Sequence, residues 1–408
     1  MKSDLDRLMQ ERDIDVAIVM GPVKGNATMF YMVEGAAISH GTLIKKRGED
    51  AVLICSSMER EEAEASGLRV VDSARYDFRK ILKDAGGDRL KAAVSYQRAV
   101  FDEFDVSGRV AFYGLGDRGS SWVFMNALSE AMPEAELIGE YDDDVFVTAR
   151  MTKDESEVER IREVGRKTCD VVAGIRDHIA SGALRDGTVM KDDGSPLTIG
   201  DVKSRIKVML AERKLIEEVD TIFAIGRDAG IPHSRGRDGD AIEEGKTIVF
   251  DIFPQEEGGG YFFDMTRTFV VGKASDEIVE HYRQLAECHD TVTAALEVGA
   301  AAAKYQTMTC EFFEKLGHET PRTNPHVTNG YVHSLGHGIG LNVHEKPTLS
   351  DMPGMDDELV PGSIFTVEPG LYYPDKGFGM RIEDVYYARP DGKMENMTNF
   401  PRDLVIDM

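Results

Sequence analysis

Short apolar runs alternate with charged stretches in the first half of the chain. Three of these runs occupy residues 16–20, 51–55 and 110–113, and each has the length of one buried strand. The segments between them are charged and helix-prone, so the alternation is typical of an α/β domain. No cluster of catalytic residue types occurs in this half of the sequence.

A helical periodicity begins after residue 150. Thr152 and Glu155 have the spacing of a capping box, so we expect a helix to begin there. Segment 141–146, which carries three aspartates, suggests a boundary between domains of residues 1–150 and 151–408. Segment 181–200 is expected to be a long exposed loop between two helices. Three helix faces packed on a sheet are predicted from apolar residues at helical spacing: Val158, Ile161, Val164, Val171, Val172, Ile175 and Ile179; Val202, Ile206, Met209 and Leu210; Ile278, Val279, Tyr282, Leu285 and Val292.

Four segments of the second half read as strands. They are rich in β-branched or aromatic residues, are bounded by glycine or proline, and occupy residues 247–253, 261–271, 363–368 and 381–388. Most of the candidate functional residues lie in or beside these segments.

Composition narrows the class of protein. A chain of 408 residues with 42% hydrophobic and 30% charged residues is long enough for two packed domains. Its net charge of −25 repels phosphate backbones and anionic lipids, so we expect neither a nucleic acid nor a membrane as partner. Its apolar runs are far shorter than the roughly 20 residues that cross a bilayer. The four cysteines form no CxxC pair and the N-terminus has no apolar signal core, which predicts a cytoplasmic protein with reduced thiols.

Two aspartates stand among apolar neighbours on either side of a glycine-rich turn. Asp251 and Asp264 lie in predicted adjacent antiparallel strands, where a buried carboxylate is costly unless it is paired or binds a cation. Side by side, they have the chemistry to share a metal ion. The alternative is an ordinary hairpin in which each aspartate makes turn hydrogen bonds.

Three histidines are clustered within a short, glycine-rich segment. His333, His337 and His344 are interrupted by Gly336 and Gly338, so a helix is improbable and a loop or irregular strand is expected. Such a backbone favours a functional site, although histidine clusters also occur as polar surface patches.

Two glutamates complete the set of candidate ligands. Glu368 ends one predicted strand, and strand alternation places Arg381 and Glu383 on one face of another. Alone, a glutamate beside an arginine is more often a structural ion pair. Together with the aspartates and one histidine, however, these residues match the ligands of two divalent ions, such as Mn, Co or Zn, bridged by a water.

The motifs around these residues carry a family resemblance. Phe263-Asp-Met-Thr-Arg-Thr-Phe269, His337-Gly-Ile-Gly, Glu368-Pro-Gly-Leu-Tyr and Arg381-Ile-Glu-Asp resemble those of the M24 metallopeptidases, which include aminopeptidase P and Xaa-Pro dipeptidase (prolidase). The resemblance covers about residues 150–408 and implies an α/β (α+β) fold with a C-terminal pita-bread catalytic domain. The metal ligands that it implies are Asp251, Asp264, His337, Glu368 and Glu383.

The resemblance also implies roles for neighbouring residues. His233 and His344 match histidines that assist with the substrate amide, Arg381 matches an arginine that supports the site, and His333 matches a histidine of the proline-specific branch. The spacing from Asp251 to Asp264 exceeds the family's usual spacing by two residues. Because side chains of a strand alternate between its two faces, an even number of extra residues in a hairpin leaves both aspartates on the same face. The first half resembles the N-terminal domain of the creatinase, prolidase and aminopeptidase P branch, which implies a homodimer with a narrowed active-site mouth.

The resulting hypothesis is an exopeptidase with two divalent ions per chain, Mn first among them, that hydrolyses Xaa-Pro bonds in dipeptides or at peptide N-termini. A metal-bridging hydroxide is the expected nucleophile, and Glu368 is the expected proton acceptor. Short peptides are the expected substrates, with His333 and Arg381 contacting them. The alternatives are a same-fold aminopeptidase without proline specificity, a creatinase-like hydrolase and a non-catalytic binding protein.

Overall fold

The structure of the protein is a computed structural model, and it describes residues 2–408. The chain divides into two compact units, one of residues 1–150 together with Gly258–Gly260, the other of Met151–Glu257 and Tyr261–Met408. None of the described helices combines the length and apolar character that crossing a membrane requires.

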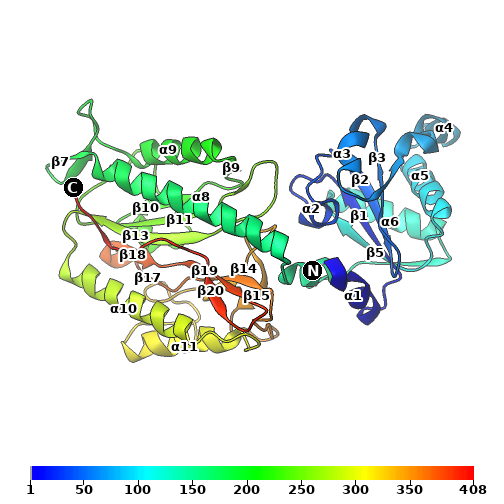
Figure 1. Cartoon of the computed structure of the whole chain (residues 1–408). Helices are drawn as coiled ribbons and strands as arrows, with labels where there is room; N and C mark the ends of the chain where they lie inside the picture. The colour runs from blue at the N-terminus through cyan, green and yellow to red at the C-terminus, as the bar shows by residue number, and fades with distance from the viewer. Residues whose placement is uncertain (1) are drawn as a thin grey trace. The chain divides into compact units, whose positions relative to one another are not determined.

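The N-terminal unit is built on a six-stranded mixed sheet in the order β4-β3-β2-β1-β5-β6 (Figure 1). The three apolar runs of the first half form β1, β3 and β5, which confirms the expected alternation of strands and helices. A core that includes Ile18, Ile54 and Phe101 fills the space between the sheet and its helices. The elements are η1 Lys2–Asp4, α1 Leu5–Glu11, β1 Val16–Gly21, α2 Ala27–Val33, β2 Gly41–Lys46, β3 Val52–Cys55, η2 Ser57–Glu59, α3 Arg60–Glu64, β4 Arg69–Asp72, η3 Ser73–Tyr76, α4 Phe78–Asp84, α5 Arg89–Glu103, β5 Gly108–Gly114, α6 Arg118–Ala131, β6 Ala135–Ile138 and α7 Val145–Met151.

The C-terminal unit places its strands between two pairs of helices, α8 with α9 and α10 with α11 (Figure 1). A four-stranded sheet has the order β10-β11-β13-β21, and a five-stranded sheet has the order β15-β14-β16-β19-β20. The helices are α8 Glu155–Ala180, α9 Ile199–Glu212, α10 Asp276–Ala294 and α11 Ala303–Lys315, with η4 Asp228–Gly230 and η5 Pro374–Lys376. The strands are β7 Ala183–Arg185, β8 Thr188–Met190, β9 Leu215–Ile216, β10 Ile222–Ile225, β11 Thr247–Ile252, β12 Gln255–Glu256, β13 Met265–Val271, β14 Gly336–Gly338, β15 Glu345–Leu349, β16 Ile364–Val367, β17 Gly370–Tyr373, β18 Phe378–Arg381, β19 Asp384–Ala388, β20 Met394–Asn396 and β21 Val405–Ile406.

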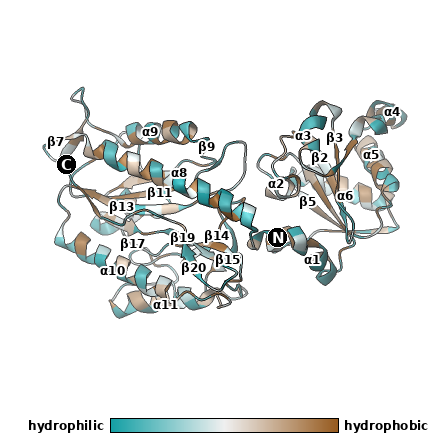
Figure 2. Ribbon diagram, viewed as in Figure 1, coloured by the Kyte–Doolittle hydropathy of each residue, from teal (hydrophilic) through white to brown (hydrophobic). Residues whose placement is uncertain are grey.

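Burial explains why the helices form where the periodicity predicts them. All seven apolar residues of the first predicted face are buried in α8, and those of α9 are buried as well. Figure 2 shows the same division, with apolar strands and helices of mixed hydropathy. In α10 the exception is Val279, which is 49% exposed although it lies beside the buried Ile278.

Four local predictions were wrong in detail. The capping box of α8 joins Asp154 and Glu157, because Thr152 forms an isolated bridge with Ser363 outside the helix. Segment 181–200 contains the hairpin β7–β8, whose turn uses Asp186 and Gly187 at positive φ, an aspartate–glycine signal that the exposed-loop interpretation overlooked.

The other two differences concern strands near the candidate site. The segment 261–271 becomes a strand only at Met265, because Phe262 and Phe263 donate their amides to Gly340 and Pro254 in place of a ladder partner. The segment 381–388 is broken after Arg381, where the chain leaves its pairing with β17 and joins β16 as β19. Glu383 therefore lies in a crossing between two sheets and not within one strand.

Candidate metal centre

Strand register brings the two aspartates together. Asp251 of β11 pairs with Thr266 of β13, and Asp264 immediately precedes β13, so Asp264 and Thr266 follow the alternation of one face. Both aspartates are buried, with exposed fractions of 7% and 4%. The two extra residues between them are absorbed by the connection that holds β12 and the three glycines of positive φ, and the pairing of the strands is intact.

The two glutamates reach the same place from strand ends. Glu368 directly follows β16, and its amide donates to the carbonyl of Leu335 over 2.8 Å. Glu383 is held by Thr266 twice, since its amide donates to the Thr266 carbonyl (3.1 Å) and its Oε2 accepts from the Thr266 hydroxyl (2.7 Å). The crossing between sheets thus fixes the direction of the Glu383 side chain.

His337 occupies the middle of β14, between two glycines. A Cβ at Gly336 would overlap the Thr366 carbonyl, and one at Gly338 would overlap the carbonyl of Lys346. The glycines therefore permit β14 to lie close between its neighbours and to present His337, which confirms the irregular strand expected there.

The tautomer of His337 follows from its contacts. Nδ1 lies 3.0 Å from the Gly338 carbonyl and donates to it, so the lone pair is on Nε2. Nε2 faces Glu368 Oε1 at 3.4 Å and Asp264 Oδ2 at 3.9 Å. Burial, with His344 nearby, lowers the pKa of His337 to about 3, so its imidazole is neutral. A neutral nitrogen facing two carboxylates is the environment that a cation stabilises.

The chemistry of the donors fits a metal ion. One ligand atom each from Asp264, His337 and Glu383 lies within 4.8 Å of the others. The Oδ1 atoms of Asp251 and Asp264 are buried and have no hydrogen-bond partner among residues 2–408. Buried carboxylate oxygens without a donor are rare unless an ion or water satisfies them.

Crowding of the carboxylates perturbs their titration. Burial, followed by the charges of Glu383 and Asp251, raises the pKa of Asp264 well above its ordinary value. Burial and the charge of Asp251 raise the pKa of Glu383 to about 8, and burial and the charge of Glu383 raise that of Glu368 well above its usual range. Divalent cations would remove this mutual repulsion.

Arg381 is committed to the protein's own groups. Its Nη2 pairs with Asp251 Oδ2, its Nε donates to Thr266 Oγ1 (3.0 Å) and its Nη1 donates to the Tyr372 hydroxyl (2.7 Å). Tyr372 in turn donates to His333 Nε2 over 2.8 Å, since His333 uses Nδ1 to donate to the Ser334 carbonyl at 2.7 Å. The chain from Arg381 through Tyr372 to His333 therefore links Asp251 to the edge of the site.

The remaining histidines lie around the same group. The rings of His344 and His337 meet edge to face with centroids 4.3 Å apart. His233 follows η4 and lies close enough to His333 and His344 that its charge lowers the pKa of both, after the larger effect of burial. All the residues proposed for the site thus lie within the C-terminal unit.

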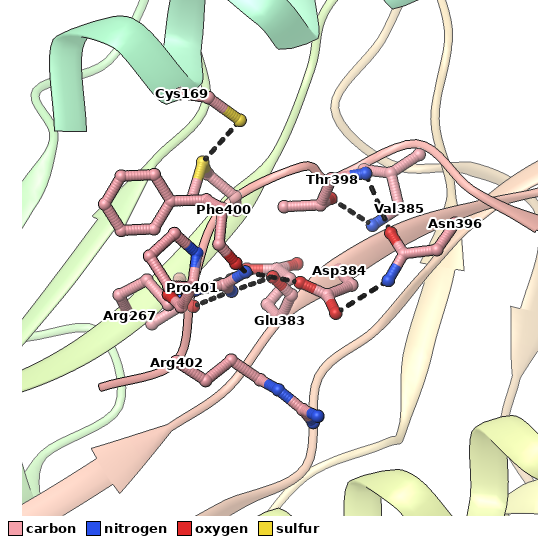
Figure 3. A network of polar contacts seen from close by, with 12 residues as sticks. Cys169, Arg267, Glu383, Asp384, Val385, Asn396, Thr398, Phe400, Pro401 and Arg402 are labelled. Carbon is pink, nitrogen blue, oxygen red and sulfur yellow. Dashed lines mark hydrogen bonds and ion pairs between the residues drawn. The ribbon is translucent and has the colours of Figure 1, made fainter. Parts of the chain in front are cut away.

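Arg267, which the sequence reasoning overlooked, supports the two strands that carry the site (Figure 3). Its Nη1 donates to the carbonyls of Thr266 and Glu383, both at 2.9 Å, and its Nη2 pairs with Asp384 at 2.8 Å. Further bonds reach the carbonyls of Phe400 (2.8 Å) and Pro401 (2.9 Å). Arg267 lies inside the motif that contains Asp264, and this proximity in sequence could have indicated that Arg267 supports the site.

A second buried pair holds the loop that carries His344. Lys153 Nζ lies 3.1 Å from Glu345 Oε2, and the two side chains are 1% and 3% exposed. The other oxygen of Glu345 accepts from the amides of Leu341 (3.1 Å) and Asn342 (3.2 Å). No sequence pattern joined Lys153 to Glu345, because they are distant in the chain.

Comparison with known proteins gives a consistent result. Residues 159–390 match the sequence profile of Metallopeptidase family M24. The Xaa-Pro dipeptidase of Pyrococcus furiosus is 27% identical over 412 residues, which cover 99% of this chain and 100% of the relative. The probable dipeptidase PepE of Mycobacterium tuberculosis is 28% identical over 263 residues, which cover 64% of this chain and 62% of the relative's length.

Solved structures share the fold. The Xaa-Pro dipeptidase from Bacillus anthracis has a TM-score of 0.76 at 23% identity and covers 100% of this chain and 99% of its own. The X-Pro aminopeptidase from Thermotoga maritima has a TM-score of 0.75 at 24% identity and covers 98% of this chain and 100% of its own. The expected mixed α/β fold with a pita-bread arrangement is therefore confirmed.

Proposed function

The chain belongs to Metallopeptidase family M24 and is an enzyme of the peptidase class, and we propose that it is a dinuclear-metal exopeptidase that hydrolyses Xaa-Pro bonds in dipeptides or at peptide N-termini. One observation carries the proposal. Two aspartates, two glutamates and a neutral histidine converge, with aspartate oxygens that no described residue satisfies.

The residues that would hold the ions are Asp251, Asp264, His337, Glu368 and Glu383. An oxygen-rich set with one imidazole suits Mn²⁺, with Co²⁺ and Zn²⁺ as alternatives. Divalent ions bound there would supply Lewis-acid polarisation of the scissile carbonyl and an acidified water.

The chain's own residues orient the substrate and move protons. Glu368, beside His337 Nε2, is the proton acceptor, because a carboxylate at the centre can take up the proton of the attacking water and return it. His344 and His233 donate hydrogen bonds to the peptide carbonyl as charge develops on its oxygen. Arg381 orients Asp251, and His333 lies at the substrate side of the Tyr372 link.

Proline specificity is the finer part of the proposal. It is supported by the full-length likeness to an Xaa-Pro dipeptidase, whereas the likeness to the probable dipeptidase PepE supports a dipeptidase without indicating proline. A homodimer, short-peptide substrates and a cytoplasmic location belong to the same proposal.

The test compares four substrates on the Mn-loaded protein. We expect release of alanine from Ala-Pro, from Ala-Pro-Ala or from both, with slower cleavage of Ala-Ala and Ala-Ala-Ala. Cleavage of Ala-Pro alone identifies a dipeptidase, and cleavage of the tripeptide identifies an aminopeptidase. Equal rates on the alanine peptides would contradict proline specificity and support the broader dipeptidase.

Asp264→Asn tests whether the proposed centre is responsible. We expect it to lose both activity and stoichiometric metal, while Asp276→Asn, an exposed aspartate of the first turn of α10, retains both. Full activity of Asp264→Asn, or wild-type protein that retains no Mn²⁺ after loading and is inactive on all four peptides, would overturn the proposal.

A further inference from the structure

A pocket of about 620 Å³ lies at one edge of the N-terminal sheet. The register of the strands places the ends of β1, β3 and β4 in one row with the start of β2. The pairs that show this are Met20 with Thr42, Gly41 with Cys55, and Cys55 with Asp72. Side chains from the three following helical segments, Phe78, Tyr96 and Phe124, form its apolar wall. Its volume is in the range of about 300–1,000 Å³ that ligand sites occupy.

Two buried polar groups of this pocket lack partners within the protein. Gln97 on α5 is 2% exposed, and its Nε2 makes no hydrogen bond to any described residue. Glu59 accepts from the Ser39 amide through Oε1 (2.7 Å), but its Oε2 is also buried and unbonded within residues 2–408. A buried donor and a buried acceptor lining one cavity call for a ligand that satisfies both.

The charges of the lining select the kind of ligand. Glu59 and Asp72 are both carboxylates, His40 is the imidazole of the lining, and the lining includes neither lysine nor arginine. An anion is therefore disfavoured and a protonated amine is favoured. The rings of Phe78 and Tyr96 meet edge to face, with centroids 5.9 Å apart. Such rings can pack against an apolar or aromatic part of a ligand.

We propose that this pocket binds a small organic amine. Its ammonium group lies at Glu59, its carbonyl or hydroxyl oxygen accepts from Gln97 Nε2, and its apolar body packs on the aromatic wall. All of these residues belong to the N-terminal unit, so the site is separate from the metal centre and does not rest on the proposed peptidase activity.

The probe is L-phenylalaninamide, which combines an ammonium group, a carbonyl and a phenyl ring. Calorimetry on the full chain is expected to give saturable binding. 3-Phenylpropanamide, which lacks only the ammonium group, should bind at least about tenfold more weakly because it forms no charge-assisted bond to Glu59. Phenylacetate should not bind.

Variants assign the binding to the pocket. Gln97→Leu and Glu59→Gln should each weaken binding by about tenfold or more, because each removes one polar partner. Their matched controls are the exposed Gln10→Leu and Glu62→Gln, which should bind as wild type does. Ala93→Leu on α5 should abolish binding by filling the cavity while leaving both polar groups in place, and thermal melting will show that it is folded.

The outcomes separate this site from the metal centre. Binding that survives Asp264→Asn but weakens by about tenfold or more in Gln97→Leu supports the proposal. Binding that is lost in Asp264→Asn and kept in the pocket variants would assign the probe to the metal centre and overturn the proposal. The absence of saturable binding would also overturn it and leave ordered water as the partner of Gln97 and Glu59.

Discussion

Replacing Arg267 by methionine should strongly destabilise the C-terminal unit. Arg267 is 1% exposed and makes hydrogen bonds to four backbone carbonyls and an ion pair with Asp384, which is 3% exposed. Methionine has a similar length but no donor, so Asp384 would remain buried and without its cation.

The magnitude follows from the burial of the pair. Removing one partner of a buried ion pair costs about 3–5 kcal/mol, because the other charge stays desolvated and uncompensated. The carbonyl of Glu383 loses its donor as well, whereas that of Thr266 keeps the Glu383 amide. An unsatisfied buried group costs about 1–3 kcal/mol, although these terms do not add fully. We therefore expect the free energy of unfolding of this unit to fall by at least about 3 kcal/mol, a large part of the roughly 5–15 kcal/mol of a typical domain.

The assay is urea unfolding of the full chain followed by far-UV circular dichroism. Trp122, the only tryptophan, lies in the N-terminal unit, so its fluorescence reports a region in which no change is expected. The matched control is Arg283→Met, whose ion pairs with Glu280 and Glu287 are surface pairs worth at most about 1 kcal/mol. An Arg267→Met transition that shifts no more than the Arg283→Met transition would refute the reasoning.

Three further predictions concern the site. Because the pKa of Glu383 is raised to about 8, the folded metal-free protein keeps a proton that the unfolded chain releases. Its stability should therefore fall as pH rises from about 6.5 to 8, above the range in which buried neutral histidines such as His337 take up protons on unfolding; thermal melting without metal measures this, and constant stability over this window would contradict it. The same proton must leave Glu383 when metal binds, so the affinity for Mn²⁺ should rise with pH by up to about tenfold per pH unit below pH 8. The calorimetric heat of Mn²⁺ binding should therefore differ between buffers of different ionisation enthalpy. Identical heats would exclude proton release. Gly336→Ala should displace His337 by overlap with a backbone carbonyl and reduce bound metal. Gly239→Ala, where a Cβ meets nothing within 4 Å and φ is not positive, should leave metal content unchanged; equal metal in the two variants would show that the close approach is not required.

Several features of this protein were available in its sequence. The spacing of apolar residues predicted α8, α9 and α10, since a buried helix face depends on neighbours a few positions apart. Gly336 and Gly338 beside His337 predicted an irregular strand, because glycine at both neighbours disfavours a helix and permits a close approach.

The boundaries of the strands and of the helix cap near the site were harder to predict from the sequence. Strand periodicity across Arg381 and Glu383 suggested one continuous strand, but the chain changes sheets between them. A pattern of period two carries no information about which neighbouring strand supplies the hydrogen bonds. The cap of α8 failed for a related reason, since Thr152 and Asp154 both have suitable side chains and only the bridge to Ser363 excludes Thr152.

The sequence by itself determined the amphipathic helices α8, α9 and α10, strands such as β1, β3, β5 and β11, the acidic charge, and the carboxylates and histidines available for a metal centre. Only the tertiary structure decided which of these groups face one another. Arg381 and Asp251 are 130 positions apart, and Arg267 and Asp384 are 117 apart. Pairing over such separations depends on how the sheets pack and on where the chain crosses between them. Local preferences of the backbone act over only one or two helical turns, so they determine neither the packing nor the crossings.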